Sequence, residues 1–81
     1  MLSKLQTNLL RLKRRLQVKD LLVYSDASNY MRYEVIAVDR NIFTAVELET
    51  GEVEDRNIFN LQHGWDFDPS YIKELELLVK N

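Results

Sequence analysis

The sequence predicts a mainly β member of the α+β class, a small antiparallel β-barrel with one helix before it and one after it. Leucines recur every three or four residues at the start, apolar residues alternate from Val18 onward, and the helical spacing returns after Pro69. No helical pattern separates the strands, so neighbouring strands are expected to pair antiparallel. We expect a single domain over residues 1–81, with a helix at 1–17, the barrel at 18–62, a linker at 63–68 and a second helix at 69–80.

Length and composition exclude several classes of protein. With 81 residues the chain has room for one small core, and its 46% hydrophobic and 30% charged residues are typical of a globular domain. The chain has no cysteine, which excludes disulfides and thiolate metal sites. It also lacks a signal-peptide pattern and any apolar run near the roughly 20 residues of a membrane span. We therefore expect a cytoplasmic protein that neither contacts a membrane nor carries a metal or cofactor.

A stripe of leucines defines one face of the first helix, with Ser3 as the expected N-cap. Because the stripe extends over only about two heptads, it is too short to form a coiled coil alone and must dock on something. Either the barrel of the same chain or a second copy of the protein can receive it. The candidate residues for self-association are Leu5, Leu9, Leu12 and Leu16.

The opposite face of this helix is basic. The first twenty residues hold six basic side chains and one acidic one, whereas the other residues hold five basic and twelve acidic ones. Such a face can neutralise phosphates, or it can simply be the solvated side of the helix. The candidate residues for nucleic-acid binding are Lys4, Arg11, Arg14 and Arg15.

The word "DRNIF" occurs twice, at Asp39–Phe43 and at Asp55–Phe59. In the first copy, Arg40 and Asn41 are expected to form a tight turn between the strands "YMRYEVIAVD" and "IFTAVELE". In the second copy, residues 55–57 are expected to form a turn after a short strand at 52–54, with Ile58 and Leu61 filling the barrel end. The flanking sequences differ, so the match is interpreted as a coincidence rather than a functional repeat.

The end of the chain predicts a helix that begins at Pro69, with Asp68 as its N-cap. A closing strand over residues 75–79 is the alternative. Trp65 and Phe67 are expected to anchor the linker to the barrel. His63, Asp66 and Asp68 are too few for a metal site, which needs a further ligand.

The stretch Val18–Leu61 resembles the Tudor-like family of small five-stranded barrels, which includes modules of the KOW type. The resemblance rests on an opening of the form "vGDlVya", with Lys19 in place of glycine, and on "tGEvE" followed by "drNIfnL". Tudor readers bind methylated lysine or arginine in a cage of aromatic rings. Tyr24 matches the first ring of that cage and Tyr30 or Met31 the second, whereas no ring stands at the other positions, Leu48, Glu49 and Thr50.

The predicted function is a small non-enzymatic interaction module that binds a protein partner, as an adaptor or as an inhibitor of the kind small phage proteins provide. No nucleophile with a base, and no glycine-rich phosphate loop, is present. Binding is expected through the acidic barrel surface or the loop after Tyr24. The candidate partner-binding residues are Tyr24, Tyr30, Glu47, Glu49 and Trp65.

The alternative is a nucleic-acid-binding module that uses the basic helix. A helix followed by five strands also resembles the Sm-like fold of ring-forming RNA binders, so this alternative includes an RNA-binding oligomer. Tyrosines near the first loop could then stack on bases.

Overall fold

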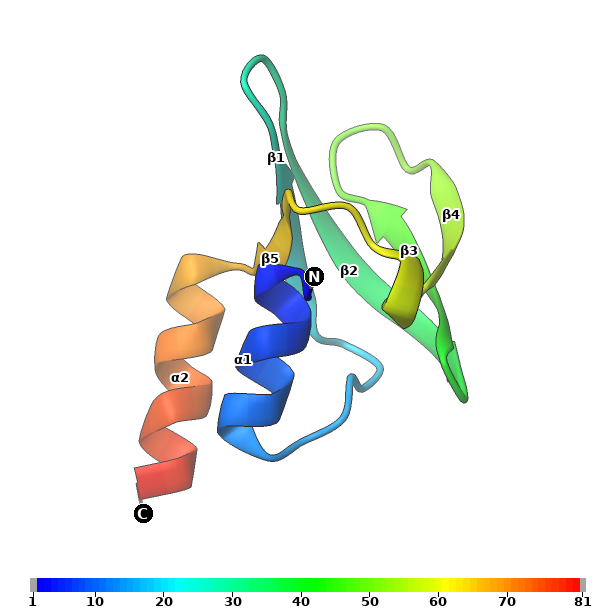
Figure 1. The fold of residues 1–81 in the computed structure, drawn as a ribbon. Helices are drawn as coiled ribbons and strands as arrows, with labels where there is room; N and C mark the ends of the chain where they lie inside the picture. The colour runs from blue at the N-terminus through cyan, green and yellow to red at the C-terminus, as the bar shows by residue number, and fades with distance from the viewer. Residues whose placement is uncertain (1, 81) are drawn as a thin grey trace.

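The fold is known from a computed structural model that describes residues 2–80 (Figure 1). The predicted mainly β α+β class, with one helix on each side of the strands, is confirmed. The elements in chain order are α1 (Lys4–Leu12), β1 (Leu21–Ser25), β2 (Tyr30–Asp39), β3 (Ile42–Glu47), β4 (Val53–Asn57), the short 3-10 helix η1 (Ile58–Asn60), β5 (Trp65–Phe67) and α2 (Pro69–Lys80).

The five strands form one antiparallel sheet in the order β4-β3-β2-β1-β5. The sheet is open, because β4 and β5 remain separate edges, so the prediction of a small barrel is only partly supported. In Figure 1, α1 and α2 lie side by side below β5 and both run away from it. No helix within residues 2–80 is long and apolar enough to cross a membrane.

The fifth strand lies inside the segment 63–68 that was expected to be a linker. β1 needs a partner on its free edge, and β5 supplies it through the pairs Leu22↔Phe67 and Tyr24↔Trp65. Both Trp65 and Phe67 point into the core while Asp66 between them does not. The role of the two rings as anchors is thus carried out by a strand.

The two "DRNIF" words adopt different structures. Arg40 and Asn41 form the predicted turn between β2 and β3, where Arg40 takes the left-handed φ of 56°. The turn expected at residues 55–57 is wrong, because these residues are the end of β4 and pair with β3. The chain turns only afterwards, in η1, where the side chain of Asn57 accepts a hydrogen bond from the backbone N–H of Phe59 at 2.9 Å.

The first helix begins as predicted and ends earlier. Ser3 and Gln6 form a reciprocal capping box at its start. The helix stops at Leu12 rather than at residue 17, because Lys13 adopts a left-handed φ of 54° and its N–H closes the last turn. Residues beyond it therefore leave the helix axis, and the face expected for Arg14 and Arg15 does not form.

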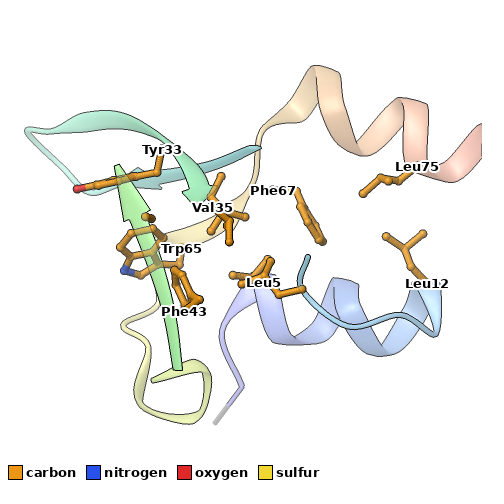
Figure 2. Packing of buried hydrophobic residues seen from close by; sticks show 11 residues of the cluster. Leu5, Leu12, Tyr33, Val35, Phe43, Trp65, Phe67 and Leu75 are labelled. Carbon is orange, nitrogen blue, oxygen red and sulfur yellow. The ribbon is translucent and has the colours of Figure 1, made fainter. Parts of the chain in front are cut away.

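The hydrophobic core runs from the inner face of the sheet to the seam between the two helices. Figure 2 shows Trp65, Tyr33 and Phe43 at one end of the core. Phe67, Val35 and Leu5 lie in the middle, and Leu12 of α1 faces Leu75 of α2 at the other end. The predicted helix at 69–80 is confirmed, and the alternative strand at 75–79 is excluded. Asp68 is its N-cap: its carboxylate accepts hydrogen bonds from the N–H and hydroxyl of Ser70, and these bonds lower its pKa.

A buried polar network around Asp20 joins the loop after α1 to β1 and α2. The carboxylate of Asp20, whose residue is 1% exposed, accepts two hydrogen bonds from Arg14 at 3.0 and 3.2 Å. It also accepts one from the Tyr71 hydroxyl at 2.6 Å and one from the Gln17 N–H at 2.8 Å. The guanidinium of Arg14 lies 5.8 Å from the centre of the Phe67 ring, so it stacks against the core as well.

Replacing Asp20 by Asn is expected to lower the free energy of unfolding by about 2–3 kcal/mol, because Arg14 would keep a largely desolvated charge without its counter-ion. Tyr71→Phe should cost about 1–2 kcal/mol, since it removes one hydrogen bond to a charged group. Urea unfolding followed by circular dichroism measures both. Asp39→Asn, at an exposed position, is the control and should change stability little. Equal effects at Asp20 and Asp39 would contradict this role of the network.

The network also predicts a loss of stability at high pH. Burial and the hydrogen bond to Asp20 raise the pKa of Tyr71 from 10.0 to about 12. Because the folded-state pKa lies above the unfolded one, this stabilisation is complete below about pH 10 and is lost as the pH approaches about 12. The free energy of unfolding should therefore fall more steeply in wild type than in Tyr71→Phe over this interval. Parallel pH profiles for the two proteins would contradict the assignment.

Candidate functional site

Two of the five predicted partner-binding residues meet in the structure. The rings of Tyr24 and Trp65 lie 5.5 Å apart, one on β1 and the other on β5. The Tyr24 hydroxyl donates to the side-chain oxygen of Gln62 at 3.0 Å. Trp65 is only 4% exposed, whereas Tyr30 is largely exposed and lies outside the hollow that Tyr24 and Trp65 line.

The two predicted glutamates are separated by the end of β3. The alternation of side chains along β3 would place Glu47 and Glu49 on one strand face, but the strand ends at Glu47 and the chain turns there. The buried carboxylate of Glu47 accepts hydrogen bonds from the N–H groups of Glu49 and Thr50, both at 2.6 Å. The bond from Thr50 is the main cause of the lowered pKa of Glu47. Glu47 therefore holds a turn, while Glu49 is exposed.

The first hollow of the molecule, which we call the aromatic pocket, lies between the two open edges of the sheet. Its volume is about 270 Å³. Trp65 forms part of its wall, and the centre of its ring lies 4.8 Å from the centre of the tilted Tyr33 ring. Burial is the main cause of the raised pKa of Tyr33. The pocket is lined by Tyr24, Met31, Tyr33, Glu54, Arg56, Asn60, Leu61, Gln62 and Trp65.

The charges of the aromatic pocket do not suit a methylated cation. Glu54 and Arg56 pair with each other at 3.0 Å, so the carboxylate that a cation would need already has a partner. The three residues at the other positions implied by the Tudor resemblance, 48–50, lie in the turn after β3 and do not line the pocket. The pocket is thus a small, nearly neutral hollow beside the core.

The four predicted nucleic-acid-binding residues do not share one face. Arg11 contacts Glu76 of α2 at 3.6 Å, and Arg14 is held by Asp20 in the network described above. Lys4 and Arg15 have no ion pair among the residues that the structure describes. About half of the expected positive charge is therefore balanced within the chain.

The leucine stripe docks on the chain's own sheet. Leu5, Leu12 and Leu16 are part of the hydrophobic core, and Leu9 packs against it while partly exposed. Of the two surfaces that could receive the stripe, the structure uses the intramolecular one.

A second hollow, which we call the α1 groove, is larger and more apolar. It lies between α1, the loop after α1, the β2–β3 turn and η1, and has a volume of about 470 Å³. The hydrogen bond from the N–H of Ile58 to the carbonyl of Asn41, at 2.7 Å, fixes η1 against the turn. Its lining residues are Leu2, Gln6, Leu9, Leu10, Arg14, Arg15, Leu16, Val38, Arg40, Asn41, Ile42, Phe43, Ile58 and Phe59.

The apolar wall of the α1 groove is solvent-exposed. Leu2 is 50% exposed, Leu10 68%, Ile42 42% and Phe59 66%. Arginines accompany this wall, and no carboxylate is among the lining residues. Arg15 and Arg40 take part in no ion pair with any residue of the described chain. A contiguous apolar surface with charged borders is typical of a site that binds a protein.

Sequence reasoning did not find the α1 groove. Its residues come from four separate segments, and only their folding together creates the hollow. One signal was present in the sequence: both "DRNIF" copies contribute their Ile-Phe pair, Ile42 with Phe43 and Ile58 with Phe59. No group of three or more side chains within residues 2–80 is arranged to hold a metal ion.

Comparison of the chain with protein-family models, with curated proteins and with solved structures found no match. The candidate sites therefore rest on the geometry of the chain itself.

Proposed function

We propose that this chain is a small non-enzymatic interaction module that binds a segment of a protein partner in the α1 groove, acting in the cytoplasm as an adaptor or an inhibitor. The observation that supports this most directly is the exposed apolar wall of that groove. Burying apolar surface is worth roughly 25 cal/mol per Å², so four large, half-exposed side chains in one hollow favour association with another apolar surface.

The α1 groove is a better candidate than the surfaces suggested by the sequence. The acidic residues of β3 and β4 are partly used within the chain, as Glu47 holds its turn and Glu54 pairs with Arg56. In the aromatic pocket, the rings of Tyr33 and Trp65 pack mainly on each other and on the core. The α1 groove combines exposed apolar side chains with two arginines that pair with no carboxylate of the described residues. This combination gives both affinity and orientation.

Placing a charge in the apolar wall is expected to weaken partner binding. Leu10→Glu and Phe59→Glu should each raise the Kd for the partner tenfold or more, which corresponds to a loss of about 1.4 kcal/mol or more of binding free energy. Leu78→Glu is the matched control, because Leu78 is a 72% exposed leucine on the other helix and does not line the groove. The measurement is quantitative affinity capture with tagged wild type and the three variants, after circular dichroism has shown equal folding.

Photo-cross-linking of the captured complex maps the contact. A photoreactive phenylalanine analogue at position 10 should cross-link to the partner that wild type retains, whereas the analogue at position 78 should not. A partner retained equally by all variants, or cross-linked only at position 78, would contradict binding in the α1 groove.

Nucleic-acid binding is the second candidate, and the pairing of Arg11 and Arg14 with acidic residues makes it weaker. We expect no change in the anisotropy of a fluorescent duplex DNA or RNA probe at micromolar protein and low salt. If the chain made four phosphate contacts, the logarithm of the binding constant would instead fall linearly with the logarithm of the salt concentration, with a slope of about −3.6. Binding with such a slope, lost in Lys4→Glu and Arg15→Glu, would favour the nucleic-acid function over the one proposed.

A further inference from the structure

The charged side chains that line the α1 groove are all positive. The whole chain has a net charge of −2, yet the lining of this groove includes three arginines and no carboxylate. Arg14 is neutralised by Asp20, which leaves Arg15 and Arg40 to act on a bound segment. Opposite charges across an interface speed association and disfavour partners of the wrong sign. The occupant is therefore expected to be acidic at its borders.

Much of the backbone around the α1 groove is already hydrogen-bonded. The β2–β3 hairpin is closed by the pair Asp39↔Ile42, and η1 is bonded to the turn through Ile58 and Asn41. α1 satisfies its own backbone, with a capping box at its start. Within residues 2–80, neither free edge of the sheet lines the groove, since these edges belong to β4 and β5. An extended peptide in the groove would therefore meet no strand edge, which is what supplies the main-chain bonds that make strand addition favourable.

A helix does not need such bonds, because its backbone groups are satisfied internally. It can present apolar side chains at i, i+3, i+4 and i+7 to a hydrophobic groove while its other face carries charge. The exposed wall made by Leu10, Ile42 and Phe59 offers the complementary apolar surface. Resting on the proposed function, we infer that the α1 groove receives one acidic amphipathic helix of a protein partner, oriented by Arg15 and Arg40.

A second copy of this chain fits the α1 groove less well. Its α2 exposes Leu77, Leu78 and Val79, which are consecutive residues and so do not form one helical stripe. The residues of α2 that have stripe spacing, Ile72 and Leu75, already pack in the chain's own core. The occupant is thus a different protein, and self-association is an outcome that the experiment must detect.

The test uses two synthetic peptides of about 14 residues, roughly four helical turns, with the same leucine stripe and with either glutamate or lysine at the outer positions. Binding of each fluorescein-labelled peptide to the full chain is followed by anisotropy. The glutamate peptide should bind wild type about tenfold more tightly than the lysine peptide at low salt, with a smaller ratio at high salt.

Reversing the groove charges should invert this preference. Arg15→Glu combined with Arg40→Glu should favour the lysine peptide, whereas Lys4→Glu with Lys73→Glu should leave the preference for glutamate. This control pair makes the same change in net charge at two exposed lysines outside the groove. Loss of binding of both peptides in Leu10→Glu would place them in the groove.

Three results would overturn the inference. Equal affinity for the two peptides, unchanged by the arginine reversals, would contradict the inference that the occupant is acidic. If neither peptide binds while the captured partner still depends on Leu10 and Phe59, the occupant is not an amphipathic helix, and the proposed function still holds. A wild-type dimer in light scattering that becomes monomeric in Leu10→Glu and in Leu78→Glu would identify the occupant as a second copy.

Discussion

The buried carboxylate of Asp20 is the interaction on which the rest of the structure depends. It connects the loop after α1 to α2 through Arg14 and Tyr71, and the backbone N–H of Lys19 beside it donates to the carbonyl of Val35 in β2 at 2.7 Å. A desolvated charge is tolerated only when it is paired and fully hydrogen-bonded. Because Arg14 must reach Asp20, the chain after α1 turns back toward the core, which leaves its neighbour Arg15 at the α1 groove.

Local signals made the starts of both helices and the turn between β2 and β3 predictable. The Ser3 cap, the Asp68-Pro69 boundary and the Arg40-Asn41 turn each depend on a few neighbouring residues, and all three are confirmed. β5 could not be predicted in this way. It has three residues, too few for a periodic pattern, and it exists because the free edge of β1 offers it hydrogen bonds.

The end of α1 shows a different limit of sequence reasoning. The leucine spacing continues to Leu16, and Leu16 is in the core as that spacing predicts, although the residues between Lys13 and Leu16 are not helical. The left-handed backbone at Lys13 carries no glycine signal, and the same holds for Lys19, whose φ is 79° at a position where the Tudor-like pattern has glycine. A non-glycine residue in this region costs roughly 1–2 kcal/mol. The Asp20 network joins Arg14 and Asp20, the residues that directly follow these two positions, and can offset that strain.

The two "DRNIF" words show why the α1 groove could not be predicted from the sequence. The same five letters form a turn and a strand in one place, and a strand end and a 3-10 helix in the other, because pairing with β3 decides the backbone of the second copy. Their phenylalanines differ accordingly: Phe43 is 1% exposed, whereas Phe59 is 66% exposed. Phe43 stabilises the core beneath the α1 groove, and Phe59 adds an apolar side chain at its border that the fold leaves uncovered. The two copies thus supply one buried and one exposed phenylalanine to the same α1 groove.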